Sequence, residues 1–132
     1  MARSTVNRGM AQKIREGIQR NLKAAAIEIE SITERSLKRG GRSGETYPVP
    51  GTARSYQASA PGEPPANRTG NYADSFRGRN QVIDLRAYIG TRDRRGRPLE
   101  LGTFKMAPRP HLRPAAMNNL ERIKRVMRRP VL

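Results

Sequence analysis

The residues able to do acid–base, nucleophilic or metal chemistry are few in this sequence and lie far apart. His111 is the one histidine, and its neighbours Pro110 and Leu112 bring neither a nucleophile nor an orienting carboxylate near it, although a catalytic histidine needs both. There are no cysteines, and the carboxylates are scattered along the chain, whereas metal ligands cluster. The sequence therefore predicts a structural role for His111 and no enzyme, metal or cofactor; a nuclease would need a carboxylate or histidine cluster.

The other chemistry-bearing segment is rich in arginine. Residues 91–98 read as a turn because they are polar and end in glycine and proline, and they carry Arg92, Arg94, Arg95 and Arg97. Four such contacts with phosphates would give a slope of log affinity against log salt of roughly −3.6 on duplex DNA. Aromatic residues are scarce, so a stacking platform for single strands is not expected. The pattern predicts non-specific contact with DNA; a solvated basic face, or one that meets an acidic subunit, is the alternative.

Composition predicts one basic domain, residues 1–132, that depends on partners. The net charge is +16, from 27 Lys and Arg against 11 Asp and Glu, and such a surface attracts nucleic acid, acidic proteins or anionic membranes. The hydrophobic share is 35%, with no Trp and 2 Phe, which is a thin core for one domain of this length. Part of the burial is therefore expected to come from other subunits. No signal peptide or membrane-spanning run is visible, so the expected site of folding is a cytoplasm.

The elements that must position these residues begin with a long amphipathic helix over residues 5–38, preceded by a flexible start at residues 1–4. Apolar positions recur at steps of three and four, and the face they define comprises Ile14, Ile18, Leu22, Ala25, Ile29, Ile32 and Ser36. Gly9 and Gly17 are expected to weaken its first turns, each by about 1 kcal/mol relative to Ala. Gly40 and Gly41 are expected to end it.

Residues 40–70 are dense in proline and glycine, and a structureless loop of this length is uncommon in a compact domain. The segment is predicted to be an extended arm that lies on a neighbouring subunit, with simple disorder or an internal loop as the alternatives. Three apolar side chains that would give the arm its grip are Tyr47, Val49 and Tyr56.

The remaining elements predict an α+β fold with a small antiparallel sheet. Residues 72–76 read as a short strand. Residues 81–90 alternate in polarity and read as a better one, with residues 99–104 pairing back as the second strand of a hairpin. A C-terminal helix follows, with Pro114 in its first turn and one face formed by Leu112, Ala116, Leu120, Ile123 and Met127. Its basic residues are Arg122, Lys124, Arg125, Arg128 and Arg129. The two helices are expected to cover one sheet.

Two segments carry a resemblance to a known family. The first is Ser59-Ala60-Pro61-Gly62-Glu63-Pro64-Pro65-Ala66-Asn67-Arg68-Thr69-Gly70, and the second is Leu99-Glu100-Leu101-Gly102-Thr103-Phe104-Lys105-Met106-Ala107-Pro108-Arg109-Pro110-His111-Leu112-Arg113-Pro114-Ala115. Together, in this order and flanked by helices, they resemble the tail-completion or head–tail joining proteins of long-tailed bacteriophages, a family of small neck and minor tail components. The resemblance spans roughly residues 10–128. The sequence departs from the family at Leu101 and His111, where an aromatic is usual, and at residues 94–98, which replace a tyrosine-rich lead-in.

The resemblance implies a structural subunit of a virion neck, assembled in the host cytoplasm and built into a ring around the DNA channel. A hexamer is favoured and a dodecamer is the alternative, with other neck and tail proteins as partners and no membrane. Candidate subunit-interface residues are Pro61, Gly62, Pro64, Pro65, Thr69, Gly70, Leu99, Glu100, Gly102, Thr103, Arg109, Pro110, Arg113 and Pro114. The arginines at 92, 94, 95 and 97 are the candidates to line the channel.

Two alternatives stay open. A non-specific nucleic-acid-binding protein would explain the charge, but it would leave both proline- and glycine-marked segments unexplained. Within the neck, a tail-terminator or connector-adaptor role is the alternative to tail completion.

Overall fold

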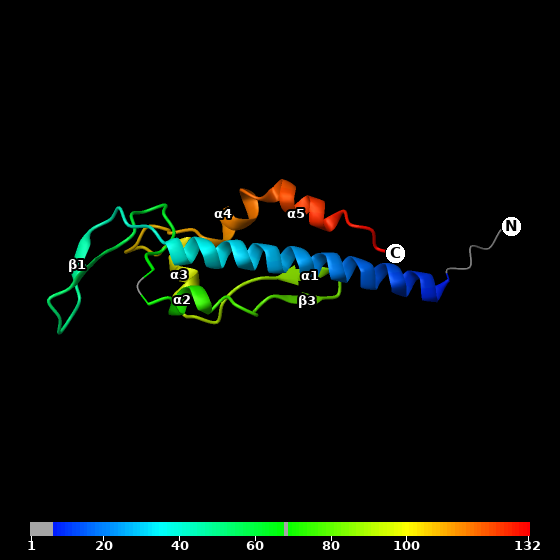
Figure 1. Cartoon of the computed structure of the whole chain (residues 1–132), viewed down its shortest axis with the longest axis horizontal. Coiled ribbons are helices and arrows are strands. Elements are labelled where there is room, and N and C mark those ends of the chain that lie inside the picture. The colour runs from blue at the N-terminus through cyan, green and yellow to red at the C-terminus, as the bar shows by residue number, and fades with distance from the viewer. Residues whose placement is uncertain (1–6, 68) are drawn as a thin grey trace.

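The structure is a computed structural model, and it describes residues 7–67 and 69–132; the predicted flexible start at residues 1–4 lies outside them. A single long helix, α1 (Arg8–Arg39), runs through the middle of the molecule. Helices α4 (Leu112–Met117) and α5 (Leu120–Met127) lie along one side of it, while α2 (Asn71–Asp74), α3 (Gly96–Leu101) and the hairpin of β3 (Gln81–Ile83) and β4 (Arg86–Tyr88) lie along the other (Figure 1). The α+β class with a long N-terminal helix and a small antiparallel sheet is therefore confirmed.

Helix α1 begins and ends where local signals place its ends. The Asn7 side chain caps the first turn by accepting a hydrogen bond from the Gly9 N–H at 3.0 Å, which is the usual role of Asn at this position. Gly40 ends the helix with φ 61°, and its N–H donates to the Ser36 carbonyl at 2.9 Å. A left-handed φ of this kind favours glycine. The predicted helix is confirmed from Arg8 onward and extends one residue further than predicted, to Arg39.

The buried face of α1 differs from the predicted isoleucine stripe. Its buried residues are Gly17, Asn21, Ala25, Ala26, Glu30, Thr33 and Leu37. Most are small or polar, whereas Ile14, Ile18 and Ile29 are only half-buried. The reason is that α1 packs against α5 on one side and against the β3–β4 hairpin on the other, so small residues let both neighbours approach. The expectation of two helices covering one sheet is wrong in this respect, because α5 packs on α1.

Gly17 has a packing role that the sequence analysis missed. A Cβ at this position would lie 2.0 Å from the Val131 carbonyl oxygen, so glycine is what lets the C-terminal backbone cross α1. One turn further along, the Asn21 amide donates to the carbonyls of Met127 at 3.3 Å and Arg129 at 2.7 Å. The Met127 carbonyl ends α5 and would otherwise lack a partner within the helix, and the Arg129 carbonyl lies just beyond it. Gly17 thus allows the C-terminal segment to lie directly against α1, and α1 continues through it as a regular helix.

The C-terminal helix is broken in two, contrary to the prediction of one continuous face. Asn118 and Asn119 interrupt it, and both are weak helix formers. The break changes the helical phase, so Ala115 and Val126 become the fully buried positions and Leu120 is left 40% exposed.

Residues 81–90 form a hairpin where a single strand was predicted, and that prediction is wrong. Strands β3 and β4 pair antiparallel, with Val82 opposite Ala87, and the chain reverses at Asp84, which has φ 53°. Asp is among the non-glycine residues that tolerate this conformation, and two-residue turns need it. Arg15 forms an ion pair with the Asp84 carboxylate, and the Gln19 amide donates to the Asp84 carbonyl at 3.0 Å. These two contacts fix the turn against α1.

The predictions of strands at residues 72–76 and 99–104 are also wrong. Residues 72–74 belong to α2 and residues 99–101 to α3. Gly70, with φ 82°, precedes α2. The Asp93 carboxylate accepts from the Arg95 N–H at 2.9 Å just before α3, a local turn that competes with strand pairing. Gly102, with φ 75°, ends α3.

The proline- and glycine-rich segment is not confirmed as one extended arm. Its middle forms a second antiparallel hairpin, β1 (Thr46–Pro48) with β2 (Ser55–Gln57), which projects beyond the end of α1 (Figure 1). Tyr47 and Val49 lie on it, whereas the Tyr56 side chain lies outside what the structure describes. The chain then returns to α1, where the Gly41 N–H donates to the Pro64 carbonyl at 3.0 Å.

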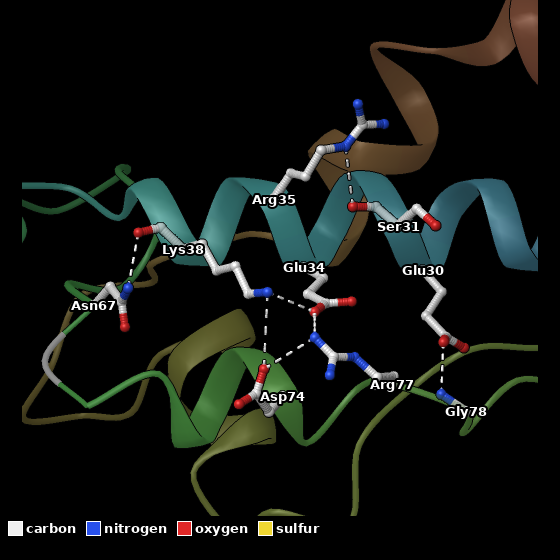
Figure 2. A network of polar contacts seen from close by, with 9 residues as sticks. All are labelled: Glu30, Ser31, Glu34, Arg35, Lys38, Asn67, Asp74, Arg77 and Gly78. Atoms are coloured by element: carbon white, nitrogen blue, oxygen red, sulfur yellow. Dashed lines mark hydrogen bonds and ion pairs between the residues drawn. The ribbon is translucent and has the colours of Figure 1, made fainter.

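A polar network fixes α2 and the loop after it to α1 (Figure 2). The Glu34 carboxylate contacts the Arg77 guanidinium and, at 2.9 Å, the Lys38 ammonium. The hydrogen bond from Arg77, followed by that from Lys38, lowers the pKa of Glu34. Buried Glu30 accepts from the Gly78 N–H at 2.6 Å. Beside this network lies the small apolar core of Leu37, Ala73 and Phe76, with Tyr72 and Leu112 packed against it.

Candidate functional site

The two segments that carry the family resemblance meet in space, although 28 residues, 71–98, separate them in sequence. The Gly62 N–H donates to the Pro108 carbonyl at 3.0 Å. The Arg109 guanidinium donates to the Ser59 hydroxyl at 2.8 Å and to the Ser59 carbonyl at 3.2 Å, and Ser59 is buried. We call this contact region, residues 59–65 with residues 99–113, the junction.

Glu100 organises the second half of the junction. Its carboxylate accepts hydrogen bonds from three successive backbone N–H groups at the start of α4, those of His111 at 2.8 Å, Leu112 at 3.1 Å and Arg113 at 2.9 Å. Burial raises the pKa of Glu100, but the three N–H donors outweigh it and the net shift is downward. The first N–H groups of a helix have no partner within the helix. Glu100 therefore caps α4, although it lies in α3 and not next to α4 in sequence.

His111 is fully buried and has contacts at both ring nitrogens. Its Nδ1 lies 2.9 Å from the Arg109 carbonyl and 3.1 Å from a Glu100 oxygen. Because a carbonyl only accepts, we assign the hydrogen to Nδ1. Nε2 then accepts from the Tyr72 hydroxyl at 2.6 Å. The rings of Tyr72 and His111 each meet Phe76 edge to face.

The Tyr72–His111–Glu100 series brings a hydroxyl, an imidazole and a carboxylate together, but its properties fit a structural role in holding the fold. Burial, followed by the charges of Asp93 and Glu100, raises the pKa of Tyr72, which is opposite to the activation that a nucleophile or base needs. Both Glu100 oxygens are occupied by backbone N–H groups. Within residues 7–67 and 69–132, no group of three or more His, Asp or Glu side chains gathers as metal ligands would. Whether the chain is an enzyme stays a prediction from sequence.

The loop after α3 presents an aromatic side chain to solvent. Gly102 permits the tight exit, since a Cβ there would lie 2.9 Å from the Met106 carbonyl oxygen. Thr103 pairs with Met106 across the turn, and this places Phe104 at 95% exposure. Leu101, just before it, is 65% exposed. Neighbouring exposed apolar side chains of this kind mark an interaction surface more often than isolated ones do.

The other candidate interface residues divide between fold and surface. Leu99 and Pro64 serve the fold through their carbonyls, which accept from Arg109 N–H at 2.6 Å and Gly41 N–H. Thr69 accepts from the Asn71 N–H at 3.3 Å before α2. Pro65 is buried, Gly70, Pro110 and Pro114 are half-buried, and Pro61, Gly62 and Arg113 are exposed.

The four arginines of residues 92–97 are all exposed, but they do not form a hairpin tip. Arg92 and Arg94 precede α3, Arg95 is its N-cap residue and Arg97 lies in its first turn. Arg95 is held by Asp93, with Nη2 to Oδ2 at 2.7 Å, and its guanidinium lies 5.3 Å from the Tyr72 ring centroid. Arg92, Arg94 and Arg97 make no ion pair with any residue that the structure describes. The structure therefore separates one structural arginine from three that are available to a partner.

A second basic region, which the sequence analysis did not single out, lies between α1 and the α4–α5 break. Arg35, Arg39 and Arg122 line a groove there. Arg35 and Arg39 stand one helical turn apart, a spacing visible in the sequence. The contribution of Arg122 depends on how α5 packs and could not have been read from spacing.

No protein-family model matches the chain, and comparison with curated proteins and with solved structures finds no match either. Among its described helices, none combines the length and the apolar character needed to cross a membrane.

Proposed function

We propose that this chain is a structural subunit of a tailed-phage neck, which completes the tail and joins it to the head connector as a ring around the DNA channel. The observation that carries the proposal is the junction. The two segments of the resemblance are joined there by Arg109, Ser59, Gly62 and Pro108, so they act as one unit. The contact between the two segments of the resemblance supports a shared role for them.

The exposed apolar surface supports a role in assembly. Phe104 and Leu101 extend from the loop next to the junction, and the β1–β2 hairpin projects beyond α1 (Figure 1). In a ring, each subunit offers one surface to the next in a head-to-tail contact that closes on itself. We assign the Phe104 loop and the hairpin to these contacts, with a hexamer favoured and a dodecamer as the alternative.

In that ring, Arg92, Arg94, Arg95 and Arg97 would face the channel, where DNA passes without being read. Their exposure supports this placement, and Arg95 would contribute least because Asp93 holds it. The test is imaging of the virion neck at a resolution that places subunits. A ring that carries the arginine segment on its inner wall is expected. A chain absent from the neck would overturn the proposal, and a ring with these arginines on its outer wall would overturn the channel placement.

The second candidate is a non-specific nucleic-acid-binding protein, and the exposed unpaired arginines favour it. It would bind duplex DNA as an isolated monomer with a steep salt dependence, and it would not need the Phe104 loop. Loss of assembly on substitution of Phe104, with unchanged DNA affinity, would favour the neck subunit over this candidate. Tail-terminator and connector-adaptor roles differ from tail completion in the neighbours contacted, which the same neck imaging would identify.

A further inference from the structure

A groove of about 640 Å³ lies between the C-terminal half of α1 and the break between α4 and α5. Its lining residues are Ile32, Arg35, Lys38, Arg39, Asn119 and Arg122. Four of these six are cationic, and there is no carboxylate among them. No residue of the arginine segment at 92–97 lines the groove, and α3 lies on the other side of α1 from α5 (Figure 1), so the groove is a separate basic surface.

The cations of the groove differ in whether they already have a carboxylate partner within the protein. The Lys38 ammonium lies 2.9 Å from a Glu34 oxygen and 4.0 Å from an Asp74 oxygen, so it is turned toward α2. Figure 2 shows the Arg35 side chain on the opposite side of α1 from that network. Its Nε donates to the Ser31 carbonyl at 3.4 Å, which leaves the two terminal nitrogens for a ligand.

Two further arginines complete the site. Arg39 makes no ion pair with a residue in the described ranges, and neither does Arg35. Arg122 pairs with Glu28 at 2.6 Å but keeps its side chain 55% exposed. Three guanidinium groups from two helices therefore surround the groove, with one carboxylate among their partners. Guanidinium groups bind phosphate in a planar, two-pronged geometry and lose little hydration in doing so.

We propose that this groove binds the phosphate backbone of duplex DNA without reading its sequence. Its lining contains no aromatic residue, so stacking on single-stranded bases has no support there. The charge favours a polyanion, and the net charge of +16 draws one to the whole molecule. The inference does not rest on the neck assignment, because the groove belongs to the monomer and would keep its cations in any setting. An acidic protein is the competing occupant.

The test is the salt dependence of duplex DNA binding by the intact chain, with Arg35→Gln/Arg39→Gln as the variant. Each phosphate contact contributes roughly −0.9 to the slope of log affinity against log salt, so loss of both arginines should make the slope shallower by about 1.8. The matched control is Lys13→Gln/Arg20→Gln, which removes two exposed charges from the other half of α1. The control should shift the slope by less than about 0.5.

Three results would overturn the proposal. The first is a groove variant whose slope equals that of the unsubstituted chain. The second is a control variant that shifts the slope as far as the groove variant does, since the charge would then act diffusely. The third is displacement of the duplex by polyglutamate at equal charge concentration, which would assign the groove to an acidic protein. Arg35 and Arg39 are exposed, so both variants should show the same helical content and thermal midpoint as the unsubstituted chain.

Discussion

The junction and the groove contain the same residue type in opposite situations. In the junction, Arg109 donates to the hydroxyl and the carbonyl of buried Ser59, and the conformation of the guanidinium is fixed. In the groove, Arg35 and Arg39 are exposed and have no carboxylate partner in the described part of the chain. The difference teaches that the arginines of a basic chain fall into two groups, according to whether their N–H donors find acceptors within the protein. Arginines whose donors are satisfied hold the fold, while unsatisfied ones are left for a partner.

The largest expected effect on stability is at Glu100. Glu100→Ala leaves three backbone N–H groups at the start of α4 without their acceptor and removes a contact of His111. Hydrogen bonds to a charged group and loss of a helix cap together predict about 2–3 kcal/mol of lost unfolding free energy. Chemical denaturation measures it.

The control for this prediction is Glu121→Ala, which removes an exposed carboxylate with one ion pair to Lys124. Its effect should stay within about 0.5 kcal/mol. Equal losses from the two substitutions would contradict the role given to Glu100.

A direct comparison of arginines comes next in size. Arg109→Gln removes the bonds to Ser59 and should lower the unfolding free energy by about 1–2 kcal/mol. Arg35→Gln should change it by less than about 0.5 kcal/mol, because exposed surface substitutions usually do. Chemical denaturation of both variants measures these losses. A larger loss of unfolding free energy in Arg35→Gln than in Arg109→Gln would contradict the distinction between the two arginines.

The pH dependence of stability follows from the same site. The pKa of Glu100 in the folded chain lies below its ordinary value because three N–H groups hold the charged form. A carboxylate with a lowered pKa stabilises the fold above its unfolded pKa, and that contribution is lost as pH falls through the folded value. We therefore expect the unfolding free energy to fall as the pH drops below the ordinary pKa of a Glu carboxyl, about 4.3, and to keep falling through the lower folded pKa of Glu100.

In Glu100→Gln this acid loss should be smaller, since the titrating group is gone while one acceptor oxygen remains. Glu34, whose pKa is also lowered, keeps its share of the loss in both proteins. Identical acid profiles for the two would show that Glu100 does not contribute.

The smallest effect on stability, and a large one on assembly, is expected at Phe104. Its side chain is 95% exposed, so Phe104→Ser should leave the unfolding free energy within about 0.5 kcal/mol. If the loop is a subunit contact, the same substitution should shift the protein toward monomers in native mass spectrometry. Lys105→Ser is the neighbouring control. An unchanged distribution of oligomers would remove the loop from the interface.

The sequence predicted the parts of this fold that depend on local signals. The long helix was predictable because its apolar positions repeat and Gly40 ends it. Residues 81–90 were misread because alternation shows a strand but not the reversal at Asp84. Residues 99–104 hold three apolar side chains, Leu99, Leu101 and Phe104, and so short a pattern fits strand and helix alike. The Asp93 turn and Gly102 decided for helix.

The site was predictable only in part, for a similar reason. The resemblance singled out Glu100, Arg109 and Gly62. Each of them bonds to a residue that lies between 11 and 50 positions away in sequence. No spacing rule reports such contacts. The groove was missed because the break at Asn118 and Asn119 sets how α5 meets α1.

Deletion of the coding sequence from its own genome, followed by electron microscopy of the particles produced, tests the central claim most directly. A neck subunit that joins head to tail predicts filled heads and separate tails, with joined particles restored when the chain is supplied again. Joined virions in normal numbers without the chain would contradict it, as would a genome that produces no tailed particles at all.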